Sequence, residues 1–272
     1  MKTTEQNSRY DNLEKLSTRE LIEGINREDH CVADAVQATL PQVEKLVDGI
    51  VERVGKGGRI FYIGAGTSGR IGVVDASEIP PTYGVRGLFA GLIAGGPQAV
   101  FNAVEGAEDD AGGAWRDLSE YGPCREDTLI GIAASGTTPY VVGGLRRARE
   151  EGLLTACVVC NEGSPAAAEA EIPIVAVVGP EFVTGSTRMK AATAQKMILN
   201  MVSTATMIRL GRVKGSKMFD MQLSNAKLVD RGTRMIMEEC GISDYEKAKA
   251  ALLKYGSVRA AVSAIGAGTL EA

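Results

Sequence analysis

Histidine is nearly absent from this chain of 272 residues, since His30 is the single one. It lies far in sequence from every glycine-rich turn of the chain, so we do not expect it to act in catalysis. Acid–base chemistry then falls to carboxylates, lysine or tyrosine. Metal-ligand spacing is absent, and so is a Gly-x-Ser-x-Gly nucleophile motif, which argues against a metal centre and a serine hydrolase.

The chain also lacks an excess of positive charge and any long apolar run. Thirty basic against 34 acidic residues give a formal net charge of −4, which argues against a nucleic-acid partner but not against a local anion site. No apolar run approaches the ~20 residues that span a bilayer. The polar N-terminus carries no signal-peptide core. We therefore expect a cytoplasmic protein without a membrane segment.

Cysteines are few, and their pattern does not predict a disulfide scaffold. The chain has five, and Cys157 and Cys160 form a Cys-x-x-Cys within an apolar, β-branched run. On a strand, positions three apart point to opposite faces, which is unsuitable for a redox or metal pair. We interpret both as buried structural residues.

Short apolar runs alternate with helical patterns over the middle of the chain. Continuous apolar runs between helices are typical of strands buried on both faces of a parallel sheet. We therefore predict an α/β fold with a doubly wound, mostly parallel sheet of five strands. The predicted strands lie near 59–63, 88–94, 129–134, 155–160 and 172–178.

Helices are predicted at both ends of the chain. We expect a loosely ordered arm over 1–17, a helix from Ser17 or Thr18, and helical spacing over 32–54 that Pro41 divides. The second end is predicted as helices over 220–240 and 243–253. The predicted organisation is an N-terminal arm with helices over 1–49, the sheet domain over 50–213, and a small C-terminal helical region over 214–272.

Three strand-to-helix turns are rich in glycine and hydroxyl groups: 64–70, 135–138 and 184–187. In a doubly wound sheet, ligands bind at the carboxyl ends of the strands. Glycines let backbone N–H groups approach a phosphate, and helix N-termini and hydroxyls add donors. Helix capping explains one such turn, but three predict a phosphate cup. The predicted binding residues are Gly66, Thr67, Ser68, Gly69, Ser135, Gly136, Thr137, Ser186 and Lys190.

Nucleotide motifs fit the first turn less well. Gly69 completes a Gly-x-Gly-x-x-Gly pattern only formally, because the segment 83–85, about 20 residues further on, offers no acidic residue for a ribose. A P-loop is excluded, since no Gly-Lys-Ser/Thr follows the turn.

Two carboxylate-bearing segments follow the first turn. Pro80 and Pro81 are expected to end the first helix of the sheet domain and to hold Glu78 near a defined bend. The segment 104–110 is acidic, and a solvated helix start would explain it.

Five motifs together give a specific resemblance, and they lie at 62–84, 92–96, 103–109, 131–141 and 184–196. Through these motifs the chain resembles the N-acetylmuramic acid 6-phosphate etherases, a family with a sugar isomerase (SIS) type phosphosugar-binding domain. The resemblance runs from about Leu16 to about Val262. It implies an SIS-type fold, a cytoplasmic role in peptidoglycan recycling, a homodimer, and no metal or organic cofactor.

The implied reaction removes the D-lactyl ether from N-acetylmuramic acid 6-phosphate and leaves N-acetylglucosamine 6-phosphate and D-lactate. The family's acid–base glutamates match Glu78 and Glu108. We expect Glu78 to protonate the departing oxygen and Glu108 to remove the proton at C2, although these roles can be exchanged.

The chain departs from the family's pattern in three places. Ile79 stands where members often carry cysteine, the segment between Tyr83 and Leu92 is one residue shorter than in some relatives, and the C-terminal helical region is short. Two alternatives remain: an aldose–ketose phosphosugar isomerase, and a non-catalytic phosphosugar sensor like the glucokinase regulatory protein. The presence of both glutamates and a single sugar-binding domain favours the enzyme.

Overall fold

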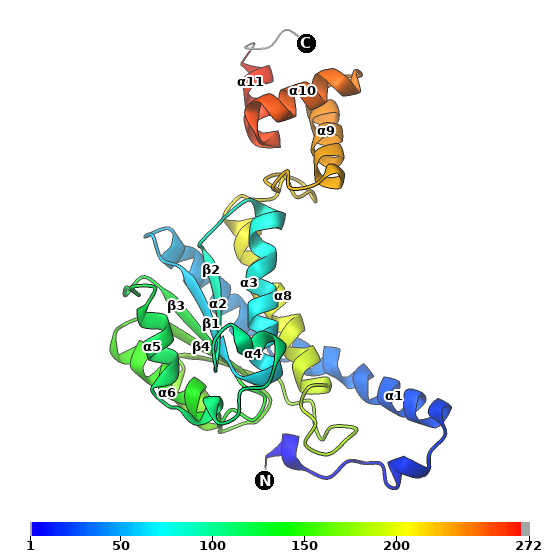
Figure 1. The fold of residues 1–272 in the computed structure, drawn as a ribbon, viewed down its shortest axis with the longest axis vertical. Helices are drawn as coiled ribbons and strands as arrows, with labels where there is room; N and C mark the ends of the chain where they lie inside the picture. The colour runs from blue at the N-terminus through cyan, green and yellow to red at the C-terminus, as the bar shows by residue number, and fades with distance from the viewer. Residues whose placement is uncertain (1, 268–272) are drawn as a thin grey trace. The chain divides into compact units, whose positions relative to one another are not determined.

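The computed structural model describes residues 2–267, which form two compact units (Figure 1). Residues of the first unit lie within Met1–Ser77 and Gly87–Thr206. Residues of the second lie within Glu78–Arg86 and Met207–Ala272. The domain boundaries inferred from the sequence stay a prediction.

The first unit contains a parallel sheet of five strands in the order β2-β1-β3-β4-β5, which confirms the predicted fold. Strand order reverses direction at β1, because the chain adds β2 on one side and the later strands on the other. In open α/β sheets, ligands bind in the crevice at the carboxyl ends of the strands, at the point where the strand order reverses. The strands are β1 (Ile60–Gly64), β2 (Phe89–Ile93), β3 (Thr128–Ile132), β4 (Leu154–Val159) and β5 (Ile172–Val175).

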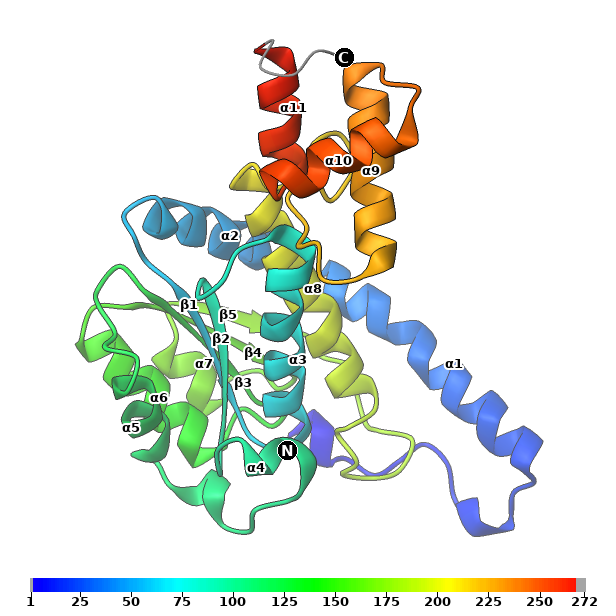
Figure 2. The ribbon, with the colours of Figure 1, turned by 45° about the horizontal axis from the view of Figure 1, so that its top comes forward.

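Helices cover both faces of this sheet (Figure 2). Tyr140, Val141 and Leu145 pack one face into an apolar cluster with Phe61 and Ile63 of β1. The elements on this face are α5 (Gly113–Ser119), α6 (Pro139–Glu150) and α7 (Pro165–Glu169), while α3 (Gly66–Tyr83) and α8 (Lys190–Arg209) cover the other.

The two cysteines of the Cys-x-x-Cys are both buried, as predicted. Cys157 belongs to the cluster on the α6 face, whereas the thiol of Cys160 points to the carbonyl oxygen of Ala191 on α8, 3.9 Å away. Burial raises the pKa of each thiol to about 12. Both are therefore protonated and inert at neutral pH.

The N-terminal helices begin as the sequence indicates. Ser17 and Glu20 form a reciprocal capping box at the start of α1 (Thr18–Gln37). The helix α2 (Leu40–Val54) carries Pro41 in its first turn, where a missing N–H costs nothing. Figure 1 shows α1 extending beyond the sheet.

Two expectations about backbone order are wrong. Residues 2–17 of the arm are docked rather than loose: they contain the 3₁₀ helices η1 (Thr3–Glu5) and η2 (Leu13–Lys15), and long-range hydrogen bonds hold them. Pro80 and Pro81 do not end α3, which continues to Tyr83. The φ angle of proline suits a helix, so the two prolines fit into the last turns of α3, where they remove only two backbone N–H donors. The final turn still forms, because the amide of Gly84 donates to the carbonyl of Pro80.

Short elements complete the first unit: α4 (Gln98–Phe101) and η3 (Ala107–Asp109). No helix in the described part of the chain is long and apolar enough to cross a membrane.

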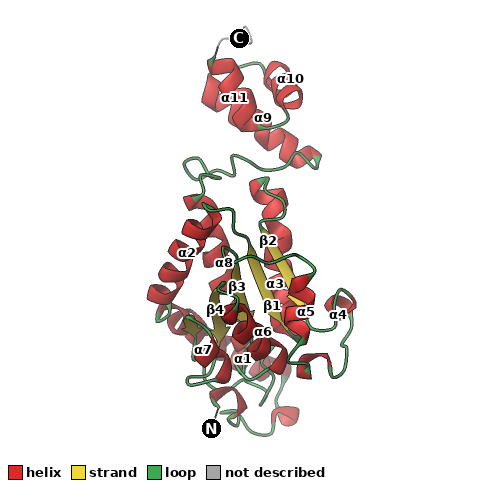
Figure 3. Cartoon of the chain, turned by 90° about the vertical axis from the view of Figure 1, so that its left-hand side faces the viewer, coloured by secondary structure: helices red, strands yellow, loops and turns green. Residues whose placement is uncertain are grey.

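The second unit contains α9 (Ala226–Cys240), α10 (Tyr245–Tyr255) and α11 (Val258–Gly266), joined by short loops (Figure 3). Asn225, Asp244 and Ser257 cap the three helices through their side chains. The helix predicted from residue 220 begins later because Asn225 takes the cap position. The helix α11 was not predicted from the sequence.

Candidate active site

The first two predicted turns lie side by side. They follow β1 and β3, which are hydrogen-bonded neighbours with Gly64 opposite Ile132. The first turn needs its glycines, because a Cβ on Gly69 would come within 2.8 Å of the carbonyl oxygen of Gly64. This close approach lets α3 begin directly after the strand. The N-termini of α3 and α6 therefore both lie at the carboxyl edge of the sheet.

Hydroxyl groups are fixed at both turns. The Oγ of Ser68 donates a hydrogen bond to Oε1 of Gln195 on α8, 2.9 Å away. The Oγ of Ser135 accepts from the backbone N–H and from the hydroxyl of Thr137, at 3.2 and 3.0 Å. Gly136 has a φ of +69°, and a Cβ there would lie 2.3 Å from the Oγ of Ser164, so only glycine fits.

Capping does not explain the second turn. Thr138 is the N-cap residue of α6, but its side chain makes no capping hydrogen bond. Pro139 has no N–H, and the amides of Val141 and Val142 donate to the carbonyl of Thr138. The amide of Tyr140 and the positive dipole end of the helix are therefore what this end offers to an anionic ligand.

The third turn differs, because protein carboxylates already occupy it. Both Oε atoms of Glu181 accept from the backbone at the start of α8, from Lys190 at 3.0 Å and from Ala191 at 2.9 Å. The ammonium of Lys190 donates to Glu28 at 2.6 Å, with side chains only 1% and 6% exposed. The phosphate-binding roles of Ser186 and Lys190 stay predictions. Lys190 can bind a phosphate only if its ion pair with Glu28 opens.

Glu108 shares a cavity with the first turn. The cavity has a volume of about 200 Å³ and is lined by Gly66, Arg70 and Glu108, with the end of β2 and the loop over 103–107. Arg70 is oriented by a 2.9 Å hydrogen bond from its Nε to the carbonyl of Val100. An exposed carboxylate and a guanidinium therefore meet beside the glycine-rich turn.

Glu78 lies elsewhere on α3. It is exposed and comes twelve residues after Gly66 on the same helix, a separation of about 18 Å along a helix axis. The structure therefore brings Glu108 to the first turn but does not bring Glu78 there.

Sequence reasoning missed two buried amides. Gln195 lies within the motif at 184–196 and holds Ser68, so the motif carried a signal for it. Asn161 is 3% exposed, and its Nδ2 donates to the carbonyls of Ala134 and Ser135 at 3.2 and 3.3 Å. Nothing in the sequence around Asn161 indicates this contact.

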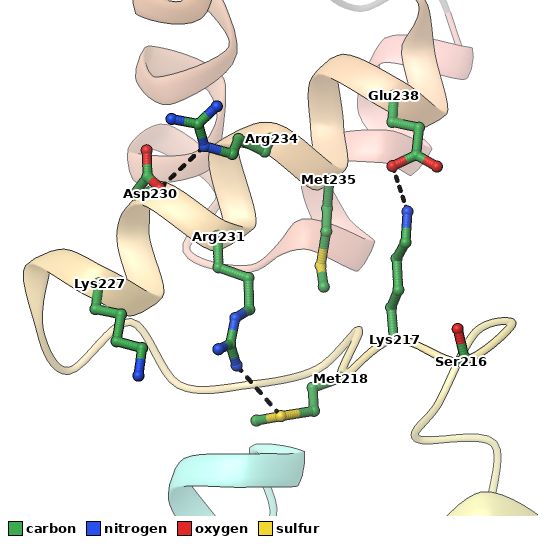
Figure 4. Close-up of a pocket in the computed structure, with 9 residues that line it drawn as sticks. All are labelled: Ser216, Lys217, Met218, Lys227, Asp230, Arg231, Arg234, Met235 and Glu238. Carbon is green, nitrogen blue, oxygen red and sulfur yellow. Dashed lines mark hydrogen bonds and ion pairs between the residues drawn. The ribbon is translucent and has the colours of Figure 1, made fainter.

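A larger cavity of about 550 Å³ lies in the second unit, on α9 (Figure 4). It holds none of the predicted residues. Lys217 pairs with Glu238, and Arg234 pairs with Asp230 at 3.0 Å, so much of its charge is compensated. Within residues 2–267, no group of three or more histidine, cysteine or acidic side chains is placed to hold a metal ion.

Comparison with solved structures supports the fold alone. Phosphoheptose isomerases from Francisella tularensis and Neisseria gonorrhoeae each match with a TM-score of 0.52 at 13% identity. They cover 70% of this chain and 100% and 99% of their own.

Comparison at the sequence level is closer. Residues 42–149 match the model of the glucokinase regulatory protein N-terminal SIS domain. The N-acetylmuramic acid 6-phosphate etherase of Bacteroides thetaiotaomicron is 62% identical over 97% of this chain and 95% of its own length. That of Salmonella typhi is 54% identical over 86% of this chain and 79% of its own. The chain therefore belongs to the N-acetylmuramic acid 6-phosphate etherase family.

Proposed function

We propose that the protein is a carbon–oxygen lyase that cleaves the D-lactyl ether of N-acetylmuramic acid 6-phosphate. The products are N-acetylglucosamine 6-phosphate and D-lactate. The observation that carries this proposal is the cavity that joins Glu108 to the glycine-rich first turn, in a chain 62% identical to a protein named for this reaction.

Elimination followed by hydration is the mechanism that two carboxylates support. In the open-chain sugar, the C1 aldehyde acidifies the proton on C2. A base removes this proton, the C3–oxygen bond breaks, and an acid protonates the departing lactate oxygen, which leaves a C2–C3 double bond. Water then adds, with its hydroxyl on C3 and a proton on C2. Each carboxylate needs the protonation state that suits its step.

We assign Glu108 as the base at C2, because it lies beside the first turn. The family's pattern gives Glu78 the role of the acid that protonates the lactyl oxygen and afterwards activates the water, although within one chain it lies about 18 Å along α3 from the first turn. Exchange of these two roles is the alternative. This mechanism uses no cofactor.

The first two turns hold the substrate's phosphate. Ser68, Ser135 and Thr137 supply hydroxyls, and the N-terminus of α6, which no side chain caps, supplies the backbone N–H of Tyr140. Anchoring the distal phosphate fixes the sugar in place, which converts a bimolecular encounter into an oriented reaction.

A homodimer that recycles peptidoglycan sugars in the cytoplasm completes the proposal. A 6-phosphosugar is charged and does not cross a bilayer unaided, so its consumer works in the compartment where it forms. Sedimentation of the purified protein at micromolar concentration tests the dimer, and a monomer would contradict it.

Assay of D-lactate released from N-acetylmuramic acid 6-phosphate tests the activity. Glu108→Gln and Glu78→Gln should each lower kcat by about 10²–10⁴-fold, the typical contribution of a general acid or base. Asp109→Asn, an exposed neighbour that does not line the cavity, is the matched control. A glutamate variant that folds normally and retains the turnover of this control has no chemical role.

The same assay separates the alternatives. An isomerase would convert an aldose phosphate to a ketose phosphate and release no lactate. A sensor would bind sugar phosphate and form no product. Neither alternative is favoured, since the curated relatives at 60–62% identity are named etherases.

A further inference from the structure

Residues 2–8, here called the leading segment, lie along the second and third turns. The hydroxyl of Thr3 donates to Oδ1 of Asn161 at 2.8 Å and to the carbonyl of Cys160 at 3.1 Å. At the other end, the amide of Ser8 donates to the hydroxyl of Thr184 at 2.9 Å. The segment thus connects two turns that follow different strands.

Asn161 fastens the leading segment to the second turn. Its Oδ1 accepts from Thr3 and from the amide of Thr4, and its Nδ2 donates to the hydroxyl of Thr4 at 2.9 Å. The same Nδ2 reaches the carbonyl of Ser135. Thr4 is 1% exposed, so this contact is part of the protein interior. Breaking it would leave buried polar groups unpaired.

Positive charge reaches the second turn through the leading segment. The ammonium of Lys2 donates a 3.0 Å hydrogen bond to the hydroxyl of Thr137, which in turn donates to the Oγ of Ser135. Lys2 is exposed, so a ligand can reach its ammonium. Lys190, by contrast, is buried against Glu28.

Negative charge lies at the third turn. A Cβ built on Gly185 would lie 3.9 Å from the carboxylate of Glu5. Glu181 occupies the helix end behind this turn. Both carboxylates repel a phosphate dianion there, so the favourable field lies on the side of Ser135 and Thr137.

We propose that the leading segment forms one wall of the phosphosugar site and that the ammonium of Lys2 binds the substrate's phosphate. This inference rests on the proposed function. It adds Lys2 to the groups of the first two turns that contact the substrate's phosphate. It also couples binding to docking: a phosphate that contacts both Lys2 and the second turn stabilises the docked leading segment.

Steady-state kinetics with a matched pair of lysine variants tests the role of Lys2. Lys2→Gln should raise KM about tenfold and leave kcat within about twofold, because it removes one charge-assisted hydrogen bond to the phosphate and no group that takes part in the chemistry. Lys2→Arg should restore most of the affinity. Lys15→Gln is the control, since its ammonium bonds Asn12 within the same arm. Equal KM values for Lys2→Gln and Lys15→Gln would overturn the inference.

Calorimetric titration with N-acetylglucosamine 6-phosphate gives a readout that needs no turnover. Lys2→Gln should weaken this binding about tenfold, again in line with one charged hydrogen bond. Unphosphorylated N-acetylglucosamine should bind both proteins equally. If the wild-type protein releases no lactate but Lys2→Gln weakens sugar-phosphate binding, the proposed function fails and the inference stands. If both proteins bind and turn over alike, the inference fails and the function stands.

Limited trypsin digestion tests the coupling to docking. Cleavage after Arg9, whose side chain is 62% exposed, requires the arm to detach. N-acetylglucosamine 6-phosphate should slow this cleavage in the wild-type protein and much less in Lys2→Gln. Equal protection of both proteins would contradict a contact between Lys2 and the phosphate.

Discussion

The second and third turns are almost alike in sequence and opposite in electrostatics. One reads Ser-Gly-Thr-Thr and the other Thr-Gly-Ser-Thr, and each precedes a helix. At the third, Glu181 accepts from the first N–H groups of α8, and Glu28 neutralises Lys190. At the second, the N-terminus of α6 has no side-chain cap, and Lys2 lies exposed beside it.

This contrast shows that a glycine and hydroxyl turn does not by itself make an anion site. A helix N-terminus carries partial positive charge that either an internal carboxylate or a ligand satisfies. At the third turn Glu181 satisfies the N-terminus of α8, and Glu28 of α1 pairs with Lys190 of α8 and so holds the two helices together. At the second turn no side chain caps α6, which leaves the helix dipole and the ammonium of Lys2 for a ligand.

Removing the charge of Glu28 tests the structural role of the third turn. Glu28→Gln leaves the buried ammonium of Lys190 without a counter-charge, and breaking a buried pair costs about 3–5 kcal/mol in the free energy of unfolding. Urea unfolding at pH 7 measures this loss. Glu23→Gln, which breaks the exposed pair with Arg19 on the same helix, should cost under about 1 kcal/mol. Equal losses would show that the pair is not structural.

Thr137→Val tests the ligand role of the second turn. It removes a hydroxyl that contacts both Lys2 and Ser135, and KM should rise about tenfold, as expected for one charged hydrogen bond. Its unfolding free energy should change by less than about 1 kcal/mol, because the hydroxyl is not fully buried. Thr187→Val at the third turn should change KM by less than about twofold. A larger effect at Thr187 would reverse the comparison.

The smallest expected effect is the change of the free energy of unfolding with pH. Burial of the Glu28 carboxyl opposes its ionisation, but the hydrogen bond and charge of Lys190 outweigh burial and lower the pKa of Glu28. A lowered pKa contributes stability that is present above the unfolded value of about 4.3 and is lost as pH falls through the folded value. Wild-type stability should therefore fall more steeply below about pH 5 than that of Glu28→Gln. Parallel curves would contradict this assignment.

Local patterns predicted much of the fold. All five strands were predicted, because buried parallel strands are continuous apolar runs. The start of α1 was also predicted, because Ser17 and Glu20 form a capping box. The course of α3 was missed, because local rules treat Pro80 as a stop although its φ suits a helix. The prediction also ended before α11, whose buried face includes Val258 and Ala261.

The site was predictable only where its residues are neighbours in sequence. The glycine turns were predicted in this way, whereas Glu108 came from the family resemblance; Gly66 and Glu108 line one cavity, and their roles stay predictions. Charge compensation was not predictable, since 162 residues separate Glu28 from Lys190. The same applies to Asn161, whose partners Thr3 and Thr4 lie at the opposite end of the first unit's sequence.

The leading segment also has a consequence for the order of folding. Its contacts close loops of 135 residues between Lys2 and Thr137 and 176 residues between Ser8 and Thr184. Loops of this length are entropically costly to close before the sheet has formed. Residues 2–8 have no complete docking surface until the chain has been synthesised as far as Thr184. The leading segment is therefore among the last parts of the first unit to reach its native position, and the phosphate site is complete only when it has docked.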